Sequence, residues 1–118
     1  MKNGKNHRVY LQDILCAIVR IEEYTTEGKA AFFADGKTQD AVIRQFSILG
    51  EAAAKLPASV KKNHADIPWK KIIGMRNIII HDYADTDLPT IWDTVQRGLQ
   101  PLRNSVEDIL KQMPHSSR

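Results

Sequence analysis

The sequence predicts an all-α protein, a single domain folded as an antiparallel bundle of four to five helices. Apolar residues recur at spacings of three and four along most of the chain, which is the repeat of a helix with one buried face. The one isoleucine-rich run that could form a strand has no second candidate strand to pair with. The 118 residues, 42% of them apolar and 26% charged, suffice for one buried core and not for two. We therefore expect one domain over residues 1–118, frayed from about residue 113.

The first predicted helix runs from about Arg8 to Tyr24. Its apolar stripe consists of Leu11, Ile14, Leu15, Ile18 and Ile21. Cys16 lies inside this pattern and is the only cysteine of the chain, so it forms no internal disulfide. We find no histidine or basic residue near it in sequence that would lower the pKa of its thiol, and we expect it to be a small buried core residue.

The charge of the chain and its targeting signals limit where it can act and which partners it can have. The net charge of +3 and the pI of about 9.1 permit contact with nucleic acid without demonstrating it. A single cysteine fits a reducing compartment. The N-terminus has no apolar signal segment, and no run approaches the ~20 apolar residues of a membrane span. We expect a cytoplasmic protein that has no membrane partner.

The middle of the chain predicts a connection followed by a second helix. Residues 25–38 contain two glycines around Phe32 and Phe33, which indicates a connection with one helical turn whose aromatic pair plugs the end of the core. The second helix follows from Thr38 to Leu56, and Pro57 stands just past it. The small residues of "GEAAA" (50–54) would let a neighbouring helix come close. Such packing would compensate for the roughly 1 kcal/mol that a glycine costs inside a helix.

Two further helices are predicted in the second half of the chain. One begins at Pro68, because proline fits the first helical position, and it contains the isoleucine-rich run. The other extends from Leu88 to Leu110 and has the strongest periodicity of the chain. Pro101 inside it removes a backbone hydrogen bond, so we expect a bend between Arg97 and Gln100.

Four polar residues stand in the most apolar segment of the chain, "WKKIIGMRNIIIHDYAD" (69–85). At about 100° per residue, Arg76 and Tyr83 share one line of a helix, and Asn77 and His81 share a neighbouring line. Burial of an arginine or a histidine costs on the order of several kcal/mol unless the side chain is paired or used. These four residues form a polar strip that the core does not require.

The polar strip has a structural and a functional interpretation. In the structural one, Arg76 forms a salt bridge with an acid such as Glu51 of the adjacent helix, His81 caps a carbonyl and Tyr83 covers the end of the core. In the functional one, the guanidinium binds a phosphate and the imidazole, whose ordinary pKa is near ~6.5, moves a proton. RNA cleavage needs such groups: a base for the ribose 2′-hydroxyl, a cation for the phosphorane and an acid for the leaving oxygen. A homodimer would bring two copies of the strip together and complete the set.

The segment "RNIIIHDY" (76–83) matches the R-x4-H-x-Y signature of HepT-type toxins in the HEPN superfamily. The segments "YLQDILCAIVRIEEYT", "DAVIRQFSILGEAAAKL", "DIPWKKIIGMRN" and "TDLPTIWDTVQRGLQPL" also resemble this family, so the resemblance covers nearly the whole chain. It implies a HEPN-like helical bundle and a metal-independent ribonuclease that acts on RNA without a cofactor.

The resemblance also implies a role for each residue of the strip. Arg76 and His81 would be the catalytic pair, supported by Asn77, in a cleft formed where the two protomers of a homodimer meet. Tyr83 would receive AMP from a partner, a minimal nucleotidyltransferase antitoxin, and the bulky charged product would block RNA. The chain would then be the toxin of a type VII-like toxin-antitoxin system.

Other interpretations stay open on the sequence alone. A non-catalytic, nucleotide-binding partner of a nucleotidyltransferase would need Arg76 but no imidazole five residues on. A metal site could use His81 with the three aspartates that follow it, Asp82, Asp85 and Asp87, although this set makes no recognised zinc pattern. Trp69 and Trp92 are expected to be core or interface anchors rather than base-stacking platforms.

Overall fold

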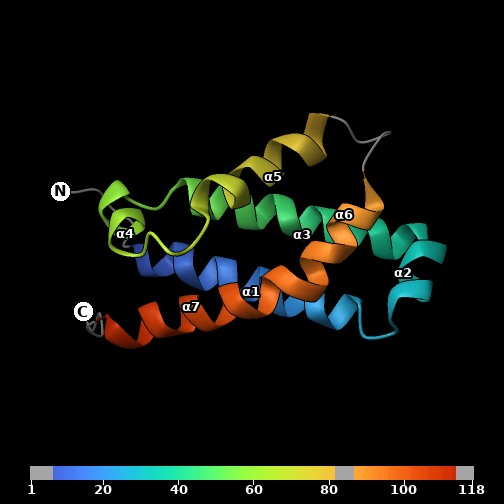
Figure 1. Cartoon of the computed structure of the whole chain (residues 1–118), viewed down its shortest axis with the longest axis horizontal. Coiled ribbons are helices and arrows are strands. Elements are labelled where there is room, and N and C mark those ends of the chain that lie inside the picture. Colours follow the sequence, from blue (N-terminus) through green and yellow to red (C-terminus); the bar gives the residue numbers. More distant parts are fainter. Residues whose placement is uncertain (1–6, 82–86, 114–118) are drawn as a thin grey trace.

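A computed structural model describes residues 7–81 and 87–113, with the backbone alone for residues 77–81. The described part of the chain is helical, with no strand, which confirms the predicted all-α class (Figure 1). Its elements are α1 (His7–Tyr24), α2 (Lys29–Ala34), α3 (Gly36–Ala54), α4 (Ala58–Asn63), α5 (Trp69–His81), α6 (Leu88–Asp93), the π-helical turn η2 (Thr94–Gly98) and α7 (Leu99–Gln112). None of these helices is both long and apolar enough to cross a membrane.

The long helices lie side by side in a bundle about α3 (Figure 1). α3 makes its most extensive contacts with α1 on one side and α5 on the other, while α7 packs on α1. The buried apolar residues of α1 are those of the predicted stripe except Leu15, which is half-buried, and Ala17 joins them. The core continues through Phe32, Phe46 and Val106, each almost inaccessible to solvent. The whole measures 46 × 27 × 25 Å.

Local signals place the helix ends. Asp35 caps α3, since its carboxylate accepts hydrogen bonds from the Lys37 amide and the Thr38 hydroxyl. The Thr38 bond, followed by the Lys37 bond, lowers the pKa of the Asp35 carboxyl. Asp87 caps α6 in the same way through the amide and hydroxyl of Thr90, and its pKa is lowered too. Both caps are complete above the usual carboxyl pKa and are lost as the pH falls through the lowered value.

The predicted bend near Pro101 is confirmed and takes the form of a π-helical turn. Over η2 the helix widens, and the Leu99 amide donates to the carbonyl of Thr94, five residues back. Pro101 has no N–H to donate to the carbonyl of Arg97, and its ring crowds that oxygen. The helix predicted over 88–110 is therefore divided into α6, η2 and α7.

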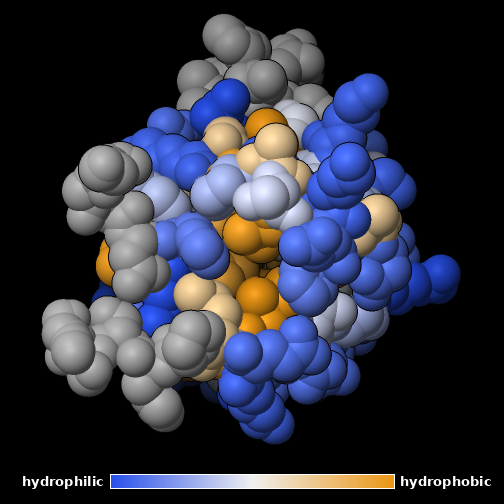
Figure 2. All heavy atoms as spheres, turned by 90° about the vertical axis from the view of Figure 1, so that its left-hand side faces the viewer, coloured by the Kyte–Doolittle hydropathy of each residue, from blue (hydrophilic) through white to orange (hydrophobic). Residues whose placement is uncertain are grey.

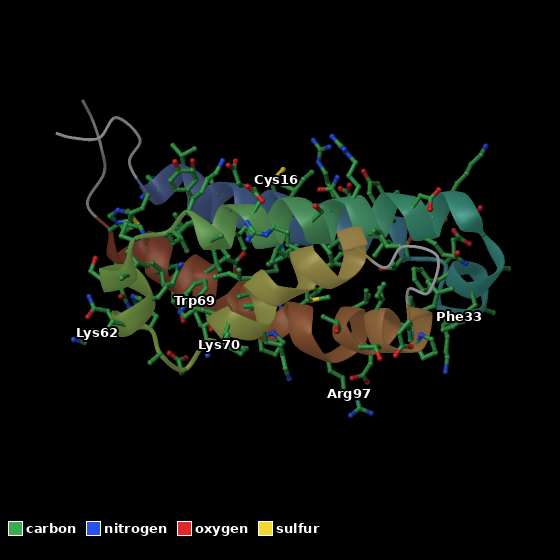
Figure 3. The ribbon with its side chains drawn as sticks, turned by 90° about the horizontal axis from the view of Figure 1, so that it is seen from above. Cys16, Phe33, Lys62, Trp69, Lys70 and Arg97 are labelled. Carbon is green, nitrogen blue, oxygen red and sulfur yellow. The ribbon has the colours of Figure 1, made fainter. Side chains whose placement is uncertain are left out.

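Two details differ from the sequence prediction. The polar segment after Pro57 forms the short α4, which has no buried residue and so no apolar period to reveal it. Cys16 is exposed, not buried, because it lies two residues from both Ile14 and Ile18 and so faces away from the core (Figure 3). Arg20, one helical turn further on, hydrogen-bonds to it.

The two tryptophans and Phe32 lie where the sequence predicted them, whereas Phe33 does not. Trp69 and Trp92 are buried, and the Trp69 indole N–H donates to the carbonyl of His64 at 3.1 Å. Phe32 is buried at the α2 end of the bundle, whereas Phe33 beside it lies at the surface. At the opposite end, which carries α4, apolar residues are visible at the centre of a ring of hydrophilic ones (Figure 2).

Candidate functional site

The site predicted from the sequence lies on α5, which packs along α3 (Figure 1). Ile67, Trp69 and Ile72 are buried and anchor the first turns of this helix. Arg76 follows Ile72 by four residues, so it lies one turn further along the face that packs on α3. The fold thus brings an arginine to the contact between α3 and α5.

Gly50 of α3 sets how closely α5 approaches at Arg76. A Cβ atom added to Gly50 would lie 2.9 Å from the Cβ of Arg76 and 3.2 Å from the carbonyl oxygen of Ile72. Side-chain carbons do not pack at the first of these distances, so any larger residue would push the two backbones apart. The predicted close approach of a neighbouring helix to the "GEAAA" segment is therefore confirmed at Gly50, and the neighbour is α5.

Glu51, the next residue of α3, holds the Arg76 guanidinium. The Arg76 Nη1 atom donates to Glu51 Oε1 at 2.9 Å. This is the ion pair that the structural interpretation of the strip predicted. The side chains remain 27% and 53% exposed, so both reach solvent. Exposed ion pairs contribute about 0–1 kcal/mol, so orientation of the guanidinium is the larger consequence of this contact.

The ion pair is compatible with binding of a second anion. The bond to Glu51 engages one of the several N–H donors of the guanidinium. A planar guanidinium can orient itself on one carboxylate and still offer donors to a phosphate. The arrangement thus gives a surface-accessible arginine, fixed in direction by α3, on a helix whose other described side chains are largely apolar.

The other residues of the strip are placed only in part. α5 extends to His81, so Arg76 and His81 belong to one continuous helix, about 7.5 Å apart along its axis. The side chains of Asn77 and His81 lie outside the described part, as does Tyr83 altogether. The structure therefore joins Arg76 to Glu51, and the roles of the other three residues stay predictions.

The alternative metal site falls on the same segment. Asp82 and Asp85 lie outside the described residues, whereas Asp87 is engaged as the cap of α6. Among the residues that are described, no group of three or more potential ligands gathers.

A largely apolar groove of about 700 Å³ lies between α5 and the kinked α6–η2–α7 helix. Met75, which precedes Arg76, and Ile72 form its α5 wall. The opposite wall includes Ile91 and Leu99. Charged residues, among them Lys71 and Arg97, also line the groove, and an apolar groove rimmed by polar residues is typical of an interaction site.

Sequence reasoning underrated two residues of this site. Gly50 was predicted as a packing residue and Glu51 as a structural partner, but both touch the candidate catalytic arginine. The signal was present in "GEAAA", where a glycine inside a helix must be compensated and the acid stands next to it. Only the pairing of the two helices shows that both residues meet at Arg76.

Comparison with known proteins places this chain among ribonucleases. The sequence profile of the family "Ribonuclease HepT-like" matches residues 14–109. A probable ribonuclease HepT of Thermococcus cleftensis is 40% identical over 108 residues, which cover 91% of this chain and 98% of that protein. A gamma-glutamylcyclotransferase and candidate RNase of Methanocaldococcus jannaschii is 36% identical over 92% of this chain and 50% of its own length. No solved structure matches the chain significantly.

Substitution of Gly50 by alanine is expected to destabilise the protein by roughly 1–3 kcal/mol, because the added methyl group overpacks the contact with Arg76. Gly74→Ala is the matched control within α5. A Cβ at Gly74 meets no described atom within 4 Å, so this variant should gain up to ~1 kcal/mol of helix propensity. Urea denaturation of both variants checks this. A Gly50→Ala protein as stable as Gly74→Ala would contradict the close contact.

Proposed function

The chain belongs to the HepT-like ribonuclease family, and from this premise we propose that it is a metal-independent endoribonuclease with Arg76 and His81 as its catalytic pair. The observation that carries the proposal is the fixed, solvent-accessible guanidinium of Arg76, which α3 positions through Gly50 and Glu51. His81 follows on the same helix, and an imidazole is the side chain whose ordinary pKa suits proton transfer at neutral pH.

The proposed reaction uses the nucleophile that RNA itself carries. A neutral imidazole takes the proton of the ribose 2′-hydroxyl, and the 2′-oxygen attacks the neighbouring phosphorus. Arg76 stabilises the negative charge that accumulates on the phosphoryl oxygens. Cleavage of the bond to the 5′-oxygen, which receives a proton from an acid, leaves a 2′,3′-cyclic phosphate and a 5′-hydroxyl. No step requires a metal ion or a cofactor.

The need for both a base and an acid favours a composite site in a homodimer. One strip supplies a single imidazole, and two strips facing each other supply a base, an acid and two guanidinium groups. The apolar groove beside Arg76 offers buried area for a second copy of the chain. We propose that the two protomers meet across this region of α5.

Regulation is proposed to act on Tyr83, two residues after His81. A cognate minimal nucleotidyltransferase antitoxin would transfer AMP to its hydroxyl, and the added charge would repel the RNA backbone from the cleft. The chain would thus be the toxin of a type VII-like toxin-antitoxin pair in the cytoplasm.

The Arg76–Glu51 ion pair also favours a second candidate function. A non-catalytic accessory subunit of a nucleotidyltransferase would need an arginine held for a nucleotide phosphate, and the observed pair provides one. Such a subunit has no use for the imidazole of His81, so that residue separates the two functions.

Replacement of His81 by alanine is expected to lower the rate of RNA cleavage by about 10²–10⁴-fold, the typical contribution of a general acid or base. Growth inhibition in cells should be lost with it, while circular dichroism and binding to the nucleotidyltransferase stay unchanged. His7→Ala serves as the control histidine variant. Full toxicity of His81→Ala would refute the nuclease proposal.

RNA cleavage that is lost in EDTA and restored by a metal ion would instead support the metal-site interpretation.

Glu51→Gln is expected to lower kcat by roughly 10-fold to 100-fold with a smaller change in KM, because the guanidinium loses its orientation. Stability should change by no more than about 1 kcal/mol, as the ion pair is exposed. Glu107→Gln, which removes a comparably exposed partner of Arg103, is the matched control and should cleave RNA like the parent. Equal kcat values for the two variants would remove Glu51 from the site.

Coexpression with the proposed cognate nucleotidyltransferase is expected to add AMP to Tyr83, which intact-mass measurement and peptide mapping detect. Tyr83→Phe should remain toxic in the presence of the antitoxin, whereas Tyr24→Phe should be neutralised like the parent. An unmodified parent chain in a neutralised culture would count against this mechanism.

A further inference from the structure

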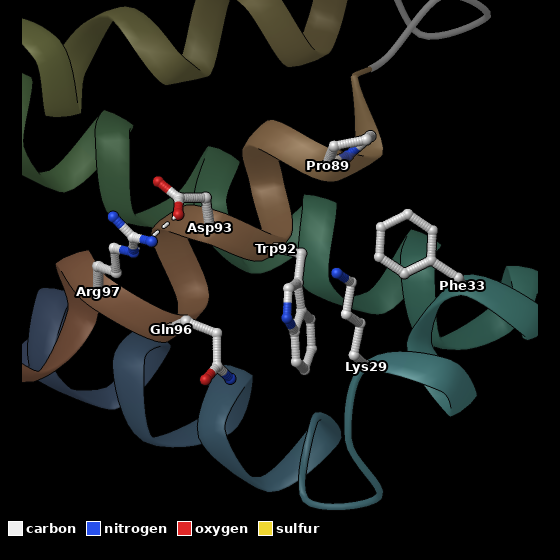
Figure 4. A pocket seen from close by; sticks show the side chains of 7 residues that line it. All are labelled: Lys29, Phe33, Pro89, Trp92, Asp93, Gln96 and Arg97. Atoms are coloured by element: carbon white, nitrogen blue, oxygen red, sulfur yellow. Dashed lines mark ion pairs between the residues drawn. The ribbon is translucent and has the colours of Figure 1, made fainter.

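A second hollow, of about 480 Å³, lies at the α2 end of the bundle (Figure 4). α2 contributes Lys29 and Phe33, and α6 and η2 contribute Trp92, Gln96 and the Asp93–Arg97 pair. We propose that this hollow is a nucleotide subsite, which binds a base and the adjoining phosphate of single-stranded RNA outside the catalytic strip. The inference rests on the proposed function for the identity of its substrate.

The aromatic wall of the hollow packs on a buried ring and is partly exposed. Phe33 is 36% exposed, although its apolar ring gains nothing from contact with water. Its ring stands edge-on to that of Phe32, at 84° and 5.4 Å between centroids, and Phe32 packs on Trp92 at 5.3 Å. Because Phe32 is buried, it anchors both neighbours. A pre-fixed aromatic ring at the surface is the platform on which nucleic-acid bases stack.

The polar groups around the aromatic wall suit the other parts of a nucleotide. Lys29 forms no ion pair with any described carboxylate, so its ammonium group is available to a phosphate. Arg97 Nε bonds Asp93 Oδ1 at 3.0 Å, which leaves the hollow with a net positive charge. The exposed amide of Gln96 offers both a donor and an acceptor, as the edge of a base requires.

The position of the hollow fits an extended substrate. Asp93 and Arg97 line this hollow and also the apolar groove whose other wall is formed by Ile72 and Met75 of α5. The two depressions therefore meet at the Asp93–Arg97 pair. The side chains of this pair are largely exposed, so they lie at the rim of the groove. A strand that leaves the proposed cleft between two protomers could pass along this rim and place a flanking base on Phe33.

The subsite is tested by RNA binding separately from cleavage. The His81→Ala protein is titrated into a fluorescently labelled single-stranded RNA of about ten nucleotides, and anisotropy reports the affinity. In this background Phe33→Ala should weaken binding by about 5-fold to 100-fold, the range for loss of one stacked base. Phe33→Leu keeps an apolar contact with Phe32 but has no ring, so it should weaken binding similarly even if the alanine variant folds poorly.

Matched controls lie elsewhere on the molecule. Val9→Ala removes an equally exposed apolar side chain, from the first turn of α1, and should leave the affinity unchanged. Lys29→Gln should reduce the slope of log K against log salt by about 0.7, the loss of one phosphate contact with a single strand. Lys62→Gln makes the same charge change at the opposite end of the molecule and should leave the slope unchanged (Figure 3).

The outcomes separate this proposal from the nuclease proposal. If the RNA affinities of Phe33→Ala and Phe33→Leu lie within twofold of that of Val9→Ala, the subsite proposal is overturned. The nuclease proposal would not be affected by this result. Weaker RNA binding by both Phe33 variants than by the His81→Ala protein would support the subsite. This outcome would hold even if the parent chain cut no RNA. Free AMP as competitor distinguishes the ligand sources: AMP that displaces the strand at low excess, in a manner dependent on Phe33, would assign the hollow to a free nucleotide instead and overturn the RNA subsite.

Discussion

The close approach of α5 to α3 at Gly50 is the constraint on which the site depends. Without a side chain at this position, the backbone of α5 comes near enough for Arg76 to lie directly over α3. Glu51 can then reach the guanidinium from the next position of the same helix. One glycine and one acid thus fix both the distance and the direction of the arginine. The cost of a helical glycine is compensated by this contact and by the neighbouring alanines, Ala52 and Ala53, which are buried.

A single residue, Pro101, also determines the local geometry in the C-terminal part of the chain. Pro101 cannot donate to Arg97, and the helix widens into the π-helical turn η2. This turn carries Gln96 and Arg97 to the surface between the apolar groove and the hollow at α2. The π-helical turn therefore contributes residues to both depressions. π-helical turns of this kind are frequent at functional sites because they redirect side chains without ending the helix.

Much of the fold could be predicted from the sequence because its main signals are local. The periodic stripes and the bend at Pro101 depend on residues close in the chain, and the run of small residues at Gly50 indicated a close contact without naming its partner. Two failures were also local: Cys16 stands off the stripe by its spacing, and α4 is too short and too exposed to show a period. The hollow at α2 was beyond sequence reasoning, since Lys29 and Phe33 meet residues 89–97 only through tertiary packing.

The small contribution of the Arg76–Glu51 ion pair to the free energy of unfolding helps to explain why an arginine stands at this position. The structural interpretation predicted the pair correctly, but a pair exposed to 27% and 53% adds only about 0–1 kcal/mol. An apolar residue on this face of α5 could pack on α3 with comparable or greater benefit. Stability alone is therefore a weak reason for the charge. What the pair does provide is a guanidinium held in one direction at the surface. That orientation is what the proposed role of Arg76 in binding a phosphate requires, so the ion pair is compatible with the proposal.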